Sequence, residues 1–253
     1  GQLTAATDVA YTPADREVPH YDSSAYKARV YMGWNKPMVT EPLRFGPNIA
    51  EWPPIPAMPE HLLIQIASTL RDEVTTTDEL IPSGETSSFR SNPLGLAEFA
   101  LSRKDPQYVG RAKDIQKAET ARMNGEKPCE AHPDVAGVMK AVRESFADAD
   151  STNTGFGSTI FAVKPGDGSA REQAASCQKV LGGLGNICYE YATKRYRSNL
   201  INWGMLPLRC DEMDIGKCKG NGEGEISCGD WVIIPGVREA IASGAESFDG
   251  YLY

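Results

Sequence analysis

The stretch STIFAVKPGDGSARE, residues 158–172, constrains the fold more than any other part of this chain. The apolar run STIFAV (158–163) predicts a short buried strand, and the run that follows Arg171 has helical spacing as far as about Leu181. Glycines at 166 and 168 allow the backbone to turn tightly between the two. A strand that passes directly into a helix is typical of α/β proteins.

The rest of the chain repeats this alternation of strands and helices. Apolar runs predict strands at 61–68, 205–210 and 229–236. Helical spacing of apolar residues predicts helices at 108–123, 133–148 and 192–204. Turn residues predict loops at 75–85 and 151–157, a break at LGGLGN (181–186) and a short extended segment at ICYEY (187–191). The fold class is therefore α/β.

The N-terminal part differs in character from the remainder. Residues 1–45 show little sustained periodicity, and residues 45–60 contain five prolines, which favour an extended connector. We expect 1–57 to be the tail of a preceding domain with a proline-rich linker, and 58–253 to form the folded domain.

Charge and hydropathy exclude several classes of partner. The net charge is −8, which disfavours general binding to nucleic acid or acidic lipid. No apolar stretch approaches the ~20 residues that span a bilayer, and the first residues lack the pattern of a secretion signal. We expect a cytoplasmic protein with no membrane partner. An anionic ligand would have to be recognised by a local group of cations.

The cysteines give no compact metal signature. The chain has six cysteines without a C-x-x-C pair, and three histidines. We favour reduced structural thiols, with disulfides or a metal as the alternative.

Two interpretations fit the junction at 164–172. In the first, the start of the helix and Arg171 bind an anion, with the Ser169 hydroxyl beside them. In the second, Ser169 is a helix N-cap and Glu172 completes a capping box, because their spacing is S-x-x-E. The glycine spacing matches neither common nucleotide-binding loop.

Four segments in the same order resemble the swivelling C-terminal domain of the aconitase family. GSAREQAA (168–175) is similar to that domain's G-S-S-R-E-H-A-A signature. TTDELIP (76–82) resembles the T-T-D-H and D-T-D-x-I-I-P segments near its start, and SSFRSNP (87–93) corresponds to the segment with a substrate-binding arginine. SNLINWGMLPL (198–208) is similar to N-L-x-x-x-G-L-L-P-L. The resemblance covers about residues 58–235.

This resemblance implies a three-layer β/β/α swivelling domain of a hydro-lyase that dehydrates and rehydrates a hydroxy-polycarboxylic acid such as a tricarboxylic acid. By motif position, Ser169 would be the catalytic base and Asp78 would orient it or balance its charge. Arg90 and Arg171 would hold substrate carboxylates. The family's 4Fe-4S cluster belongs to other domains, so we expect no cofactor or metal in this chain and no turnover by the chain alone.

The chain departs from the family pattern at four positions. Ala170 takes the substrate-binding place of the second serine, so one hydroxyl contact is absent. Gln173 and Glu79 replace histidines, and Lys194 stands where many members have arginine. These changes leave the substrate and its stereochemistry open.

Several settings accommodate such a domain. We favour one piece of a single-chain hydratase whose cluster-bearing domains lie upstream. The alternative is the small subunit of a two-subunit, isopropylmalate isomerase-like enzyme. Other classes are a non-catalytic module that binds a polycarboxylate or another anion, and an RNA-binding protein, which the acidic charge disfavours.

Overall fold

The computed structural model describes residues 4–8, 20–29, 35–210 and 226–253. Cys218 lies outside this described part. The chain divides into two compact units, Gly1–Arg44 and Phe45–Tyr253. The proline-rich segment up to residue 57 thus falls in the second unit, and the interpretation of 1–57 as the tail of another domain stays a prediction.

The first unit contains two short helices, η1 (Ala6–Asp8) and α1 (Ser24–Arg29). The helix α1 follows Asp22, whose carboxylate accepts hydrogen bonds from the N–H and the hydroxyl of Ser24 at 2.8 and 2.7 Å. None of the residues of α1 is buried.

The second unit is built on a six-stranded sheet with the strand order β6-β5-β3-β1-β7-β8. The first four strands in this order are parallel, and β7 and β8 extend the sheet in antiparallel pairings. The strands are β1 (His61–Leu70), β3 (Thr154–Ala162), β5 (Gly183–Cys188), β6 (Leu206–Arg209), β7 (Trp231–Ile234) and β8 (Tyr251–Leu252).

Hydrophobic residues cover both faces of this sheet. Alternate residues of β1 belong to different clusters: Leu63 packs with the helices, whereas Leu62 and Ile64 pack on the opposite face. All nine residues of β3 are buried. Continuous apolar strands such as these are expected where a parallel sheet is covered on both sides.

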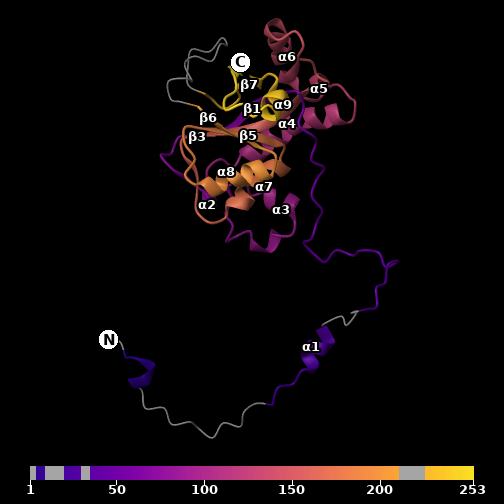
Figure 1. Ribbon diagram of the computed structural model, residues 1–253, viewed down its shortest axis with the longest axis vertical. Helices are drawn as coiled ribbons and strands as arrows, with labels where there is room; N and C mark the ends of the chain where they lie inside the picture. Colours follow the sequence, from indigo (N-terminus) through magenta and orange to yellow (C-terminus); the bar gives the residue numbers. More distant parts are fainter. Residues whose placement is uncertain (1–3, 9–19, 30–34, 211–225) are drawn as a thin grey trace. The chain divides into compact units, whose positions relative to one another are not determined.

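Most of the helices pack in the larger of the two clusters, whereas Val237 of the last helix belongs to the smaller one. The helices are α2 (Thr77–Leu80), η2 (Ser87–Phe89), α3 (Pro93–Ala97), α4 (Tyr108–Met123), α5 (Pro128–Ala131), α6 (Pro133–Ser145), α7 (Arg171–Val180), α8 (Lys194–Asn202) and α9 (Val237–Ala242). In Figure 1, α2, α3, α7 and α8 lie together on one side of the sheet. Each of the four motif segments includes residues of one of these helices.

Most of the predicted elements are confirmed, and the α/β class with a largely parallel sheet is observed. The helix predicted at 108–123 has these bounds in the structure, and the predicted strand at 61–68 is part of β1. The helix that follows the 164–170 junction ends at Val180.

The glycine-rich break is confirmed as the end of the helix, since α7 ends at Val180. The extended segment predicted at 187–191 was placed too late, because β5 begins at Gly183 within LGGLGN and ends at Cys188. A Cβ on Gly183 would lie 2.7 Å from the carbonyl oxygen of Gln178, and one on Gly157 would lie 2.4 Å from Leu184. Glycine is needed where these segments approach one another closely, which is a requirement that local propensity does not contain. The loop predicted at 151–157 was also too long, since β3 begins at Thr154.

The loop predicted at 75–85 contains a two-residue strand and a short helix. Strand β2 (Thr75–Thr76) is followed by α2, and Thr76 is its N-cap. The Thr76 hydroxyl accepts from the N–H of Glu79 at 3.3 Å, and the Glu79 carboxylate accepts from the N–H of Thr76 at 2.7 Å. This reciprocal capping box explains why a helix starts in a stretch of turn-forming residues.

The longest of the described helices, α4, has 16 residues, and none of the described helices could span a bilayer.

The five described cysteines are free thiols, as the sequence favoured. Burial raises the pKa of Cys177 and of Cys188 to about 12. Since the thiolate is the reactive form, we expect both to resist alkylation of the native protein at pH 8. The exposed Cys228 should react before both of them, as measured by peptide mass spectrometry after a short exposure to iodoacetamide. Equal labelling of Cys177 and Cys228 would contradict this packing.

Candidate functional site

A second, two-stranded sheet brings two of the motif segments together. β2 pairs in parallel with β4 (Pro165–Asp167), so that Thr75 lies opposite Pro165. Immediately after β4, Gly168 lies against the start of α2, and a Cβ at this position would be 2.2 Å from the Thr77 hydroxyl oxygen. The TTD segment and the GSARE segment are therefore in direct contact through backbone that requires glycine.

The start of α8, the helix that contains the first part of the SNLINWGMLPL motif, is attached to the same loop. Thr193, the N-cap of α8, donates its hydroxyl to the carbonyl oxygen of Gly166 at 2.9 Å and accepts from the N–H of Tyr196 at 3.3 Å. Gly166 has a φ of +98°, and a Cβ there would lie 2.3 Å from the Tyr196 ring. The first turns of α2, α7 and α8 consequently surround the loop at 165–170.

The start of α7 is not a capping box. Its N-cap is Ala170, which has no side-chain cap, and Ser169 lies one residue earlier. The Glu172 carboxylate instead accepts a hydrogen bond from the indole N–H of Trp203 at 3.1 Å. With the oxygen of its side-chain amide facing α7, Asn199 accepts from the N–H of Glu172 at 2.8 Å. Of the two interpretations of the junction, the serine N-cap is wrong.

A cavity of about 290 Å³ lies between the first turns of α7 and α8. It is open to solvent, and its lining residues are Ser169, Arg171, Glu172, Lys194, Arg195, Ser198 and Asn199. Ser169 is exposed, and its hydroxyl has no hydrogen-bond partner within the described part of the chain. The structure therefore brings Ser169 and Arg171 into one cavity, which we call the α7–α8 pocket.

The Arg171 side chain carries an unsatisfied donor. Its Nε atom is buried and has no hydrogen-bond partner among the described residues. Buried polar atoms of this kind are uncommon in folded proteins, and one explanation is a ligand or ion that completes the site. Arg171 is thus placed to accept an anionic partner.

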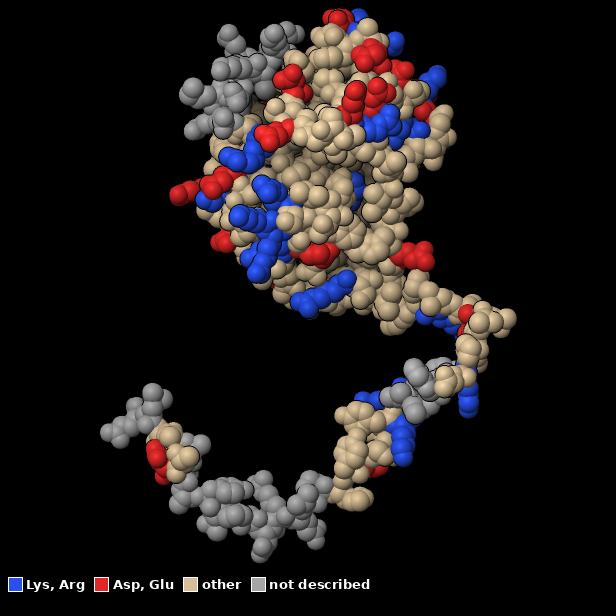
Figure 2. Space-filling view, in the orientation of Figure 1, with Lys and Arg blue, Asp and Glu red and all other residues tan. Residues whose placement is uncertain are grey.

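The cations of the α7–α8 pocket lack carboxylate partners. Within the described ranges, Arg171, Lys194 and Arg195 have no carboxylate oxygen within 4.0 Å, whereas cations elsewhere, such as Arg103 and Arg122, form ion pairs. Figure 2 shows a group of Lys and Arg side chains on the face formed by α7 and α8. An acidic chain of net charge −8 thus contains a local positive surface at its candidate site.

Arg90 lies on the other side of the first turn of α7. It lines a smaller cavity of about 40 Å³ together with Glu172 and Gln173, two residues of that turn, and with Trp52. Trp52 packs against Trp203 with ring centroids 4.4 Å apart, which attaches the proline-rich segment to this region. Arg90 and Arg171 are therefore separated by the first turn of α7 and do not line the same cavity.

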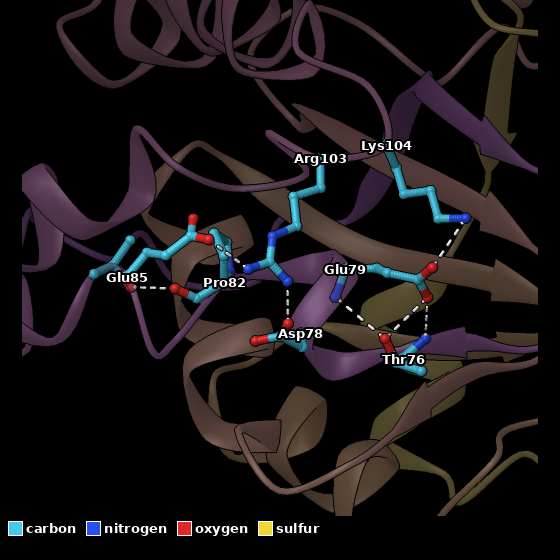
Figure 3. Close-up of polar contacts among 8 residues, drawn as sticks. Thr76, Asp78, Glu79, Pro82, Glu85, Arg103 and Lys104 are labelled. Carbon is cyan, nitrogen blue, oxygen red and sulfur yellow. Dashed lines mark hydrogen bonds and ion pairs between the residues drawn. The ribbon is translucent and has the colours of Figure 1, made fainter.

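Asp78 forms an ion pair with Arg103, a residue for which the sequence predicted no role. Arg103 donates to the carboxylates of Asp78 and Glu85, and it lies between them in Figure 3. No hydrogen bond joins Asp78 to Ser169 or Arg171 in the described structure. The ion pair is exposed, so its contribution to stability is small. A role for Asp78 in charge balance stays a prediction.

Glu79, which stands in place of a family histidine, is part of the capping box. Partial burial raises the pKa of its carboxyl, but hydrogen bonds from the Thr76 N–H and from Lys104 lower it by more, so the net shift is downward. Lys104 Nζ lies 2.9 Å from Glu79 (Figure 3). The side chain is therefore an ionised structural group and not a proton donor at neutral pH.

The structure also shows the surroundings of two further departures, Ala170 and Gln173. Ala170 is half-buried and packs against the helix-side core, so this position offers no hydroxyl to a ligand. Gln173 lines the Arg90 cavity.

Sequence reasoning missed three lining residues of the α7–α8 pocket, namely Arg195, Ser198 and Asn199. The predicted helix at 192–204 places residues 195, 198 and 199 on one face by their spacing of three and four. The sequence shows that periodicity, but it does not show that α8 packs against α7.

No group of three or more His, Cys, Asp or Glu side chains that could hold a metal ion occurs among the described residues. The described cysteines therefore do not fit the ligand set of an iron–sulfur cluster.

One comparison with known protein families agrees with the motif assignment. The family model of the aconitase C-terminal domain matches residues 157–213, which include the junction, α7, β5 and α8. No curated protein matches the sequence. A solved structure of 3-isopropylmalate dehydratase (leuD) from Methanocaldococcus jannaschii has 18% sequence identity and a TM-score of 0.41, covering 76% of this chain and 83% of that one. The family match includes Ser169, Arg171 and the lining residues of α8, so residues 157–213 of this chain are similar to the aconitase C-terminal domain.

Proposed function

We propose that the chain is the swivelling domain of an aconitase-like hydro-lyase that acts on a hydroxy-polycarboxylic acid. The observation that carries this proposal is the α7–α8 pocket, where the unpartnered Ser169 hydroxyl lies with the unpaired Arg171 at the start of a ten-residue helix. These groups suit the binding of a carboxylate and the removal of a proton beside it.

The first role of the pocket is to bind the substrate carboxylate. Arg171 offers a planar set of donors that matches a carboxylate, and the positive end of the α7 dipole adds to the attraction. When the adjacent carbon loses its proton, negative charge develops on this carboxylate. The same donors then bind it more strongly, which lowers the barrier.

The second role belongs to Ser169. As an alkoxide it would take the proton from the carbon next to the bound carboxylate and become a hydroxyl. A serine alkoxide is strongly basic, so it needs nearby positive charge, which Arg171, Lys194 and Arg195 provide in the same pocket. The exposure of Ser169 leaves it accessible to a substrate that also contacts another domain.

Arg90 would hold a further carboxylate from the opposite side of the α7 turn. Its cavity in this chain is small, about 40 Å³, and Trp52 forms part of its lining. A substrate that contacts both arginines would have to extend past the first turn of α7.

The elimination also requires the departure of the substrate hydroxyl. A 4Fe-4S cluster bound to other domains would supply a Lewis acid for that group. The described residues provide no ligands for it, so we assign it to cluster-bearing domains, either upstream in the same polypeptide or in a separate large subunit.

The direct test is reconstitution with those domains. The chain should be produced together with the coding sequence that adjoins it and assayed anaerobically with a panel of hydroxy-di- and tricarboxylic acids. We expect ultraviolet absorbance from an unsaturated product with at least one of them, and none with the isolated chain. A complex that binds a cluster yet dehydrates none of these acids would contradict the proposal.

A further inference from the structure

We propose that Lys194 and Arg195, on the first turn of α8, form a second anion subsite in the α7–α8 pocket. The inference rests on the proposed function, in which Arg171 binds the first carboxylate. It adds that this pocket takes two acidic groups of one ligand, so that the domain selects di- and tricarboxylates over monocarboxylates.

The two cations face the pocket from a different helix than Arg171. Lys194 and Arg195 both line it, whereas Arg197, also exposed on α8, does not. Arginine offers a planar pair of donors that fits a carboxylate or a phosphate, and lysine adds a compact charge. The subsite therefore consists of one bidentate group and one point charge beside the first turn of α7.

Ser198 does not supply a further donor to a ligand. Its hydroxyl donates to the carbonyl oxygen of Lys194 at 3.0 Å, so that only its oxygen lone pairs remain for a ligand. Lone pairs do not bind an anion, so recognition of the second acidic group depends on the two cations.

Asn199 lies between the helix turns that carry the two subsites. With its oxygen toward α7, its side chain accepts from the Glu172 N–H at 2.8 Å and donates to the carbonyl oxygen of Arg195 at 3.3 Å. One amide thus connects the turn that carries Arg171 to the turn that carries Arg195. We assign Asn199 as a positioning residue for a ligand with two anionic groups.

The charge of the pocket fits such a ligand. Arg171, Lys194 and Arg195 contribute three positive charges against the single lining carboxylate, Glu172, which leaves an excess of two positive charges in the lining. Like charges without counter-ions repel one another and oppose folding. A ligand with two negative groups would relieve this repulsion, whereas a monocarboxylate would relieve it in part.

The test is calorimetric titration of the full chain with acetate, succinate, tricarballylate and inorganic phosphate at low ionic strength. Wild-type affinity should rise from acetate to the two polycarboxylates. Arg195→Gln should weaken binding of succinate and tricarballylate by about tenfold, the expected loss of one charge-assisted hydrogen-bonded pair, and leave acetate unchanged. Arg197→Gln, which removes the same charge from the same helix outside the pocket, should stay within about twofold of wild type.

The remaining variants separate this inference from the proposed function. Arg171→Gln should weaken all three carboxylates. Suppose that Arg171→Gln weakens binding of the carboxylates but Arg195→Gln binds every probe like wild type. The second subsite is then wrong, whereas the carboxylate site at α7 is supported. Equal losses of polycarboxylate affinity in Arg195→Gln and Arg197→Gln would show that only the net charge of the helix matters. That result would overturn the subsite. A loss confined to phosphate would show that the second group is not a carboxylate and contradict the proposed selectivity. If wild type binds none of the probes, both proposals fail.

Discussion

Ser169→Ala is expected to reduce dehydration by the reconstituted enzyme by at least ~10³-fold, while substrate binding changes little. The reason is that the substitution removes the group proposed to take the proton and leaves Arg171, Lys194 and Arg195 in the α7–α8 pocket. Losses of this size are usual when a nucleophile or a base that works with its surroundings is deleted. The measurement is kcat and KM for dehydration, with cluster content determined in the same samples.

Ser145→Ala is a suitable control for this experiment. Ser145 is an exposed serine at the end of α6 and does not line the pocket, so its loss should leave kcat unchanged. If Ser169→Ala keeps wild-type kcat, the base is another residue. If it instead raises KM while kcat holds, Ser169 is a binding group. Either result removes Ser169 from the proposed chemistry.

Gly166→Ala is expected to destabilise the folded domain by about 2–5 kcal/mol, the combined magnitude of a strained left-handed alanine and an overpacked core. Gly166 has a φ of +98°, and the added Cβ would lie 2.3 Å from the Tyr196 ring. Tyr196 is fully buried, and its hydroxyl accepts from Gln178 at 2.9 Å and from Asn186 at 2.7 Å, so the ring has little room to move. The measurement is the free energy of unfolding in urea.

Gly229→Ala separates the two contributions. Gly229 has a similar φ of +104°, but a Cβ there would meet nothing within 4 Å. Its alanine variant should lose about 1–2 kcal/mol, the cost of the backbone conformation alone. If both variants lose the same amount, the contact between Gly166 and Tyr196 does not determine the position of the junction loop.

Sequence reasoning succeeded where one segment determines its own structure. The apolar run at 61–68 and the helical spacing at 108–123 required no knowledge of their neighbours, and both elements are observed. Sequence reasoning failed where contacts with other segments determine the structure of a segment. β5 contains two glycines because adjacent segments approach its backbone, and two of the residues that approach it, Met205 and Leu206, are distant in the sequence.

The capping box illustrates the same limit within four residues. Both Thr76–Glu79 and Ser169–Glu172 have the S/T-x-x-E spacing. The first forms a reciprocal box, whereas the Glu172 carboxylate is taken by Trp203. Spacing alone does not distinguish them, because the competing partner of Glu172 is thirty-one residues away.

The candidate site was predicted in part for a similar reason. Motif order located Ser169 and Arg171, and the structure brings both to one cavity. The ion pair of Asp78 with Arg103 and the link from Asn199 to Glu172 depend on tertiary packing. Motif comparison assigns a position to a role, but it does not show which side chain holds that position in place.

The most direct test of the central claim, that the start of α7 and Arg171 bind a carboxylate of the substrate, is an NMR titration of the chain with tricarballylate. The account predicts that the amide signals of residues 168–172 and the Nε–H signal of Arg171 shift together and saturate, because Arg171 has an unsatisfied donor within the described structure. Arg171→Gln should abolish the saturating shifts. Signals at 168–172 that stay unchanged while the ligand shifts residues elsewhere would contradict the account.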